Sequence, residues 1–354
     1  MTDPRSGTIE LDGSFLETLT FEGREFQKHA VENEIYYGPI DDEEIDRLDL
    51  QHRVLSGVFD HRLIFPPVES LDKVLDCGYG SGAWAVEVAE QYETCDVSKF
   101  PTSSGIPAIN LENLKVIGVD VSPHMRPDDT PDNLWLQVDD LNRHFTFGYN
   151  QFDLVHSRLV ASGINQDRWP RYLRDIVSSA INDLGLAENT RSLKRGGWAQ
   201  MVEIYFNIQS DNGALTENHA LRKWSSSYIK ALEGVKDVRA GMKLTSLMTS
   251  AGLVDIESKM IPLPLSGWSN GEYYHLLGAG HRSRSLDPRM RVIGAMNRDN
   301  TQQWLSSLAL YPFMQKLHMS RDELNNIITH AREEADDPSL RAYVPLYVCI
   351  GRKP

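Results

Sequence analysis

The sequence predicts an α/β protein built on a mostly parallel β-sheet, and three observations lead to this fold class. Between about residues 69 and 205, short apolar segments alternate with amphipathic helical segments, which is the pattern of parallel strands joined by crossover helices. The first apolar segment runs directly into a glycine cluster, in VLDCGYGSGAW at 74–84. Acidic residues lie at or directly after the ends of the first three strands, where open α/β sheets bind their ligands. The sequence therefore predicts a ligand site at the carboxyl ends of the strands.

The first 68 residues are expected to form an arm followed by a helical cap. Residues 1–35 show weak periodicity, which predicts a loosely held arm. Residues 39–62 begin with clustered acidic residues and continue with apolar residues at steps of three and four, which predicts an amphipathic helix. His52 lies on the apolar stripe of this helix and is expected to face inward.

A core is expected over residues 69–205, with its strands in chain order. Strands are expected at 73–78, 114–122, 133–141, 152–158 and 196–206, with helices after the first strand and at 171–184. The interval from Gly82 to Asp120 is 38 positions, against about 20 in a compact unit, which predicts an inserted loop at about 94–113.

The remainder is expected to form a second cap and a closing strand. Residues 206–340 are predicted to be a helical cap or lid that contributes a core strand near 253–260, and 341–354 the final core strand. Helices are expected at 217–234 and 240–253, and the stretch 268–335 is expected to be mainly helical.

Composition excludes several classes of function. The formal net charge of −14 argues against a nucleic-acid partner, because such binding draws on clustered lysine and arginine. No apolar run approaches the roughly 20 residues of a membrane helix, and the start lacks a basic segment followed by an apolar one, so no membrane contact and no secretion are expected. Cys77, Cys95 and Cys349 are too scattered for a disulfide framework or a metal site, which favours a cytoplasmic location.

The glycine cluster allows two kinds of cofactor. Gly78, Gly80 and Ala83 satisfy the G-x-G-x-x-A pattern of a dinucleotide site. Asp76, Gly78, Gly80 and Gly82 satisfy D-x-G-x-G-x-G, the pattern of a loop that holds S-adenosylmethionine. A carboxylate at position 76 would repel a pyrophosphate but could attract the ammonium group of a methionyl chain, so Asp76 favours the second interpretation.

Acids after the next two strands agree with a bound nucleoside. Asp120 ends the second strand, from which a carboxylate can accept both ribose hydroxyls, with Val121 beside it. Asp139, Asp140 and Leu141 end the third strand, where an adenine amino group and ring would lie; a solvated pair of acids is the alternative.

From these residues the chain resembles the class I S-adenosylmethionine-dependent methyltransferases, and among them the LaeA-like fungal methyltransferases of secondary metabolism. The resemblance runs from about Tyr36 to Pro354. It rests on YYGPIDDEEIDRLDLQH, VLDCGYGSGAWA, VIGVDVSP, FDLVHSR, WPRYLR, GGWAQMVE and YVPLYVCIGRKP. The chain departs from the family at two of these places. Tyr79 stands where a small residue is more common, and the usual proline before Gly196 is missing.

The resemblance implies a Rossmann-like seven-stranded sheet with an antiparallel last strand, N- and C-terminal cap elements, and S-adenosylmethionine as cofactor. It places Asp76 and the three glycines at the methionyl part, Asp120 at the ribose, and Asp139, Asp140 and Leu141 at the adenine. Their neighbours Cys77, Tyr79, Val121 and His156 are counted with the cofactor-binding residues.

Methyl transfer needs an acceptor atom aligned with the methyl group and does not need a metal ion, so no metal site is expected. His156, at the end of the fourth strand, is the first candidate for a general base, although a packed ring beside the cofactor is an equal alternative. His52 is the second candidate, with a core histidine as the alternative. Glu203 is counted with the catalytic residues as an anchor for a polar substrate, with pairing to a neighbour as the alternative. The aromatic residues Trp268, Tyr273 and Tyr274, together with Tyr36 and Tyr37, are expected to bind the substrate.

The predicted function is methylation of an oxygen or nitrogen atom of a small secondary metabolite in the fungal cytoplasm. A regulatory protein that acts through protein partners, with a nuclear location, stays open, as does a homodimer. An NAD(P)-dependent oxidoreductase is the third alternative, against which Asp76 argues.

Overall fold

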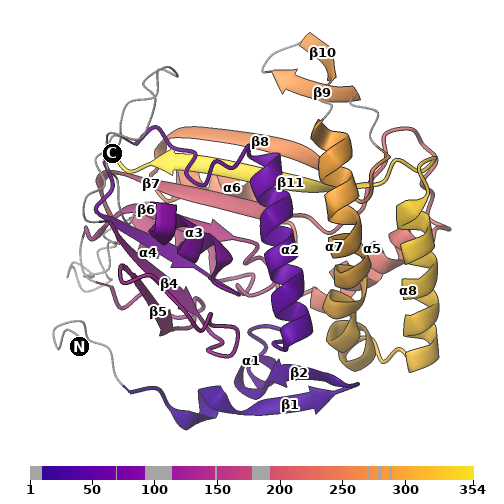
Figure 1. The fold of residues 1–354 in the computed structure, drawn as a ribbon, viewed down its shortest axis with the longest axis horizontal. Helices are drawn as coiled ribbons and strands as arrows, with labels where there is room; N and C mark the ends of the chain where they lie inside the picture. Colours follow the sequence, from indigo (N-terminus) through magenta and orange to yellow (C-terminus); the bar gives the residue numbers. More distant parts are fainter. Residues whose placement is uncertain are drawn as a thin grey trace.

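A computed structural model describes residues 10–68, 70–91, 114–147, 150–177, 192–268, 272–277, 281–286 and 289–354, the sixth and seventh ranges by their backbone alone. Its main sheet has seven strands in the order β5-β4-β3-β6-β7-β11-β8 (Figure 1). The strands are β3 (Lys73–Cys77), β4 (Lys115–Asp120), β5 (Leu134–Val138), β6 (Phe152–Arg158), β7 (Leu193–Ile204), β8 (Val254–Pro264) and β11 (Tyr343–Arg352).

The sheet confirms the predicted fold class. β3 pairs in parallel with β4 and β6, and the parallel pairs β4–β5 and β6–β7 extend it on both sides. β11, the last strand of the chain, lies between β7 and β8 and is antiparallel to both. Val74, Leu75 and Cys77 are fully buried, as expected of a central strand with both faces covered.

Helices cover both faces of the sheet. α3 (Ala83–Gln91) packs against β4 and β5. α4 (Trp169–Val177) and α6 (Ala240–Ser250) pack against each other and against β7. α6 also contacts β8 and β11, so this helix, which the predicted boundaries assign to the cap, lies on the sheet.

The remaining long helices form a layer at one end of the sheet. α2 (Asp42–Val58) contacts α7 (Arg289–Tyr311), which contacts α8 (Arg321–Asp336), and these three stand side by side in Figure 1. α5 (Ala220–Leu232) packs against α7 and α8. The predicted helix at 39–62 is confirmed as α2, and the side chain of Asp41 accepts a hydrogen bond from the Glu44 N–H at its start.

The N-terminal segment is better ordered than its weak periodicity predicted. A 3₁₀ turn (Gly13–Leu16), the hairpin β1 (Thr18–Phe21) and β2 (Arg24–Gln27), and α1 (Lys28–Glu32) lead into α2. The amide of Gln27 donates at 2.9 Å to the carbonyl of Val121, beside the end of β4. The prediction of a loose arm is therefore wrong for residues 10–35, because contacts distant in the sequence hold them.

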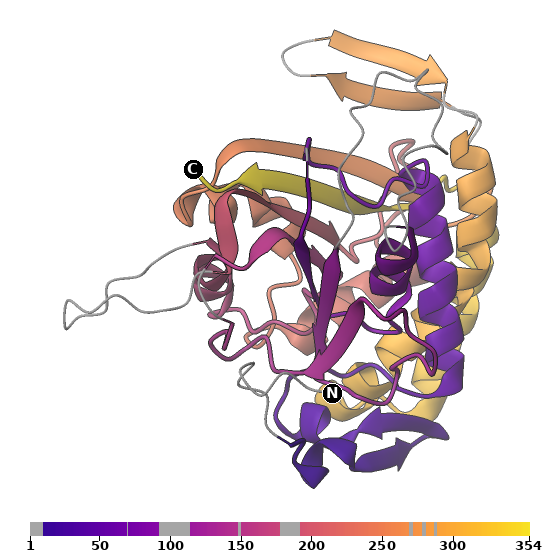
Figure 2. The same ribbon diagram turned by 60° about the vertical axis from the view of Figure 1, so that its left-hand side comes forward.

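A second hairpin replaces part of the predicted helical region. β9 (Glu272–Leu277) pairs with β10 (His281–Leu286), and this hairpin projects from the opposite end of the molecule to the β1–β2 hairpin (Figures 1 and 2). The helical prediction is wrong there and correct for α7 and α8. The predicted insertion at 94–113 lies outside the described residues.

In the described part of the chain, no helix combines the length and the apolar character that crossing a bilayer requires.

Candidate functional site

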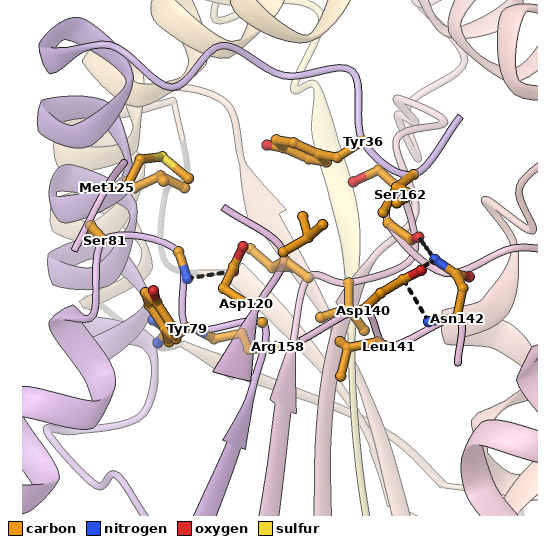
Figure 3. A pocket seen from close by; sticks show the side chains of 18 of the residues that line it. Tyr36, Tyr79, Ser81, Asp120, Met125, Asp140, Leu141, Asn142, Arg158 and Ser162 are labelled. Atoms are coloured by element: carbon orange, nitrogen blue, oxygen red, sulfur yellow. Dashed lines mark hydrogen bonds between the residues drawn. The ribbon is translucent and has the colours of Figure 1, made fainter. Parts of the chain in front are cut away.

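A cavity of about 130 Å³, measured as the space open to the centre of a water molecule, lies at the carboxyl ends of the central strands. Two smaller cavities measure about 10 Å³ each, which is room for a single water molecule. The large cavity is therefore the candidate ligand site. It is lined by residues 78–81, 120–121, 125, 140–142, 158–160 and 162–163 of the core and by 35–36, 48 and 51 of the cap (Figure 3).

The glycine turn after β3 forms one wall of this cavity and requires its glycines. Gly78 has φ +76°, and a Cβ atom there would lie 2.6 Å from Cγ1 of Val160. Gly80 has φ +58°, and its N–H donates to Oδ2 of Asp120 at 3.0 Å. The turn thus exposes backbone to the cavity at a place where larger residues would be strained.

Asp120 lies at the end of β4, across the cavity from Tyr36 in Figure 3. Its other carboxylate oxygen accepts the N–H of Ser122 at 3.0 Å. Burial raises the pKa of Asp120, while the N–H donors of Ser122 and Gly80 oppose this rise. The carboxylate is thus fixed in position and keeps lone pairs for a ligand hydroxyl.

The segment after β5 is held by a network of side chains. Asp140 Oδ1 accepts from the N–H and the side-chain amide of Asn142, at 2.9 and 3.0 Å. That amide also donates to the carbonyl of Gly163, in the loop after β6. The ammonium of Lys236 donates to the same carbonyl and to that of Ile35, which joins this loop to the cap.

The structure brings together part of the predicted cofactor set. The predicted residues that line the cavity are Gly78, Tyr79, Gly80, Asp120, Val121, Asp140 and Leu141. Those that do not line it are Asp76, Cys77, Gly82, Asp139 and His156. Asp76 is 2% exposed, and burial raises its pKa to about 7. The predicted contact between Asp76 and a methionyl ammonium group stays a prediction.

Both candidate bases, His156 and His52, line a second, smaller cavity instead. The ring of His156 stacks on Trp84 with centroids 3.8 Å apart, and its Nδ1 accepts from the amide of Gln200 at 3.1 Å. Burial lowers the pKa of His156 well below its ordinary value. His52 lines the same small cavity. Neither histidine lines the large cavity, and their catalytic roles stay predictions.

Glu203 supports the loop that closes the cavity after β6. Its carboxylate accepts the N–H groups of Val160 and Ala161 at 3.0 and 3.2 Å. Burial raises the pKa of Glu203 to about 8, against the opposing effect of these two donors. Its predicted catalytic role also stays a prediction.

The raised pKa of Glu203 predicts a pH-dependent contribution to stability. Its folded-state pKa of about 8 exceeds the ordinary value, so the folded state binds the extra proton and stability falls as pH rises from about 5 to 8. In urea unfolding, the free energy of unfolding of the wild type minus that of Glu203→Gln should fall over this range. The exposed Glu257→Gln on β8 is the control. Parallel curves for wild type and Glu203→Gln would contradict the assignment.

Among the five predicted substrate residues, Tyr36 lines the large cavity. Tyr37 stacks on Tyr311, with centroids 5.8 Å apart and planes 6° apart. The indole N–H of Trp268 donates to the carbonyl of Ala342 at 2.7 Å. Tyr273 and Tyr274 belong to β9, where the structure describes the backbone alone.

Several lining residues were not predicted. Leu48 and Gln51 reach the cavity from α2, one turn apart, and Leu48 belongs to the apolar stripe that predicted this helix. Arg158 ends the FDLVHSR strand, two residues after His156. The other unpredicted lining residues with polar or flexible side chains are Ser81, Met125, Asn142 and Ser162.

No protein-family model matches the chain. Curated fungal relatives match 92% of it. The secondary metabolism regulator laeA of Aspergillus niger is 26% identical and covered over 74% of its length. The regulator LAE1 of Cochliobolus heterostrophus is 24% identical and covered over 92% of its length. The methyltransferase pytC of Aspergillus terreus is 24% identical and covered over 86% of its length.

Solved structures are more distant. The phosphoethanolamine N-methyltransferase 2 of Haemonchus contortus matches 86% of this chain with a TM-score of 0.43 and 17% identity, and the match spans about half, 52%, of that enzyme's chain. The [4+2]-cyclase SpnF matches 85% of this chain and 80% of its own, with a TM-score of 0.42 and 12% identity.

Over 92% of its length the chain is thus similar to the LaeA-like fungal regulators of secondary metabolism and to the methyltransferase pytC, and its seven-stranded sheet with an antiparallel last strand confirms the predicted Rossmann-like core.

Proposed function

We propose that this protein binds S-adenosylmethionine in the large cavity and transfers its methyl group to an oxygen or nitrogen atom of a small secondary metabolite. The observation that carries the proposal is the fixed carboxylate of Asp120, which faces the cavity at the end of β4 beside the glycine turn. A carboxylate in this position accepts the hydroxyls of a ribose.

The proposal assigns a group of lining residues to each part of an adenosyl ligand. Asp120 and Val121 would hold the ribose, and Asp140 with Leu141 would hold the adenine. The exposed backbone of residues 78–81 would lie along the methionyl chain. When bound, S-adenosylmethionine supplies the methyl group on its sulfonium centre.

The chain's own task is then to orient the acceptor and to exclude water. Tyr36, Leu48 and Gln51 close the cavity from the cap side, and Ser162 adds a hydroxyl from the loop after β6. Gln51 and Ser162 would orient an oxygen or nitrogen acceptor by hydrogen bonds, while Tyr36 and Leu48 supply apolar surface. Neither His52 nor His156 lines this cavity, so the acceptor atom would lose its proton without direct contact to either histidine.

A regulatory role is the second candidate, because laeA and LAE1 are named regulators and match 92% of the chain. In that case the methyl acceptor or binding partner is a protein. The cytoplasmic location, a nuclear one and a homodimer stay predictions.

The test is transfer of a labelled methyl group. Purified protein is incubated with methyl-labelled S-adenosylmethionine and an extract of the organism that makes it, and the label is followed into small molecules and into protein. Label in a small product that requires the added protein supports the proposal. Label in protein alone supports the regulatory role, and no transferred label from an active extract contradicts both forms of methyl transfer.

A further inference from the structure

Arg158 is the single positively charged side chain among the described residues that line the large cavity. It ends β6, and because Ser157 pairs with Cys77 in the sheet, Arg158 stands level with the start of the glycine turn. Figure 3 shows it on the opposite side of the cavity from Tyr36. Arg158 also lines the second, smaller cavity together with His52, so this cation lies between the two cavities, beside the glycine turn.

This guanidinium lacks the ion pair that comparable arginines have. Arg47 pairs with Glu44 at 2.6 Å, and Arg168 pairs with Asp175. Among the described residues, no carboxylate forms an ion pair with Arg158, whose Nη1 lies 3.2 Å from Nδ1 of His52. Since charges removed from water are normally paired, Arg158 has a place for an anion.

The groups around Arg158 hold it in place, and none of the described carboxylates forms an ion pair with it. His52 Nε2 lies 2.5 Å from the carboxylate of Glu87 on α3, so the imidazole is oriented with Nδ1 toward Arg158. Burial lowers the pKa of Arg158, and the charges of Asp76 and Glu87 oppose this change. The side chain is thus a positioned donor with free capacity.

We infer that Arg158 forms a carboxylate-binding site at the wall of the cavity, an inference that rests on the proposed function. A planar guanidinium matches a carboxylate in a two-point contact. A doubly charged phosphate fits less well, because Asp120 and Asp140 line the same cavity. The carboxylate belongs either to the methionyl end of the methyl donor or to an acidic acceptor.

Ligands that differ in one group distinguish these sources. S-adenosylhomocysteine carries the amino-acid end, its decarboxylated analogue lacks only the carboxylate, and 5′-methylthioadenosine lacks the whole end. If Arg158 binds the donor, calorimetry with the wild type should show a preference for S-adenosylhomocysteine over the decarboxylated analogue. Arg158→Met should lower the affinity for S-adenosylhomocysteine by roughly ten- to a hundredfold and leave the affinity for methylthioadenosine nearly unchanged.

If the site serves an acceptor, the second arm responds instead. Benzoate is titrated as a carboxylate probe into protein saturated with S-adenosylhomocysteine. Wild type should bind benzoate and Arg158→Met should not, while both variants keep equal affinity for S-adenosylhomocysteine. Arg298→Met is the matched control, because it removes a cation with a 51% exposed side chain that lies outside the lining and pairs with Asp336.

Folding is separated from binding in two ways. Arg158→Lys keeps the cation and should recover part of the lost affinity in whichever arm responds, and the wild-type preference between the analogues needs no variant. Equal affinity for the carboxylate and decarboxylated ligands, together with no benzoate binding, overturns the inference. If the wild type binds no adenosyl ligand, the proposed function fails. Benzoate is then titrated into the free protein: binding that Arg158→Met abolishes supports the carboxylate site by itself, and no binding overturns it.

Discussion

Replacing Asp120 with alanine is expected to lower the affinity for S-adenosylhomocysteine by roughly a hundredfold or more, because each hydrogen bond to a charged group contributes about 1.5–3 kcal/mol. The variant removes the proposed ribose acceptor and also releases the N–H groups of Gly80 and Ser122, which the carboxylate accepts at 3.0 Å. Both effects act on the ligand site. Isothermal titration calorimetry measures the change.

Asp139→Ala is the matched control for this result. Asp139 lies 19 positions further along the chain at the end of the neighbouring strand, but it does not line the cavity, and its side chain accepts the N–H of Asp140. Its affinity should change far less than that of Asp120→Ala. Unchanged affinity in a folded Asp120→Ala protein would remove the ribose assignment, with the melting temperature as the check on folding.

Trp224→Ala is expected to lower the free energy of unfolding by about 3–5 kcal/mol, the usual cost of deleting a fully buried aromatic side chain. Trp224 stacks on Tyr228 at 5.1 Å between centroids and meets the edge of Trp304 at 4.9 Å. Its indole N–H donates to the carbonyl of Leu305 at 2.7 Å. This side chain therefore joins α5 to α7 inside the cap.

Urea unfolding measures this loss, and Trp135→Ala is the control. Trp135 lies on β5 and is 44% exposed, so its replacement should cost well under 1 kcal/mol, or about 0.5 kcal/mol as at most surface positions. A small effect of Trp224→Ala, similar to that of Trp135→Ala, would mean that the cap is not packed as the structure shows.

The core of the fold follows from local sequence features. β3 and β4 are apolar on both faces, and α2 carries its acidic start and apolar stripe in one continuous segment. Asp120 could be predicted because the last residue of a parallel strand lies at the ligand-binding edge of the sheet, whichever face of the sheet its side chain is on. The antiparallel direction of the last strand came from the family resemblance, and its place between β7 and β8 was not predicted, since strand order is not a local property.

The cap and the details of the site depend on contacts between distant segments. The β1–β2 hairpin has short strands with weak periodicity, and its place is set by packing of Phe21 and Phe26 on Tyr311. His156 was expected to face the ligand, but its ring stacks on Trp84 of α3, a partner that strand position alone cannot identify. Arg158, two residues further at the end of the strand, lines both the second, smaller cavity and the large one, which strand position alone does not predict either.

The central claim is that the cavity is built for an adenosyl methyl donor. Calorimetric titration of the purified protein with S-adenosylhomocysteine, and separately with NADH, tests it most directly. The account predicts saturable binding of one S-adenosylhomocysteine per chain and no competition from NADH. Saturable binding of NADH by a protein that fails to bind S-adenosylhomocysteine would contradict it.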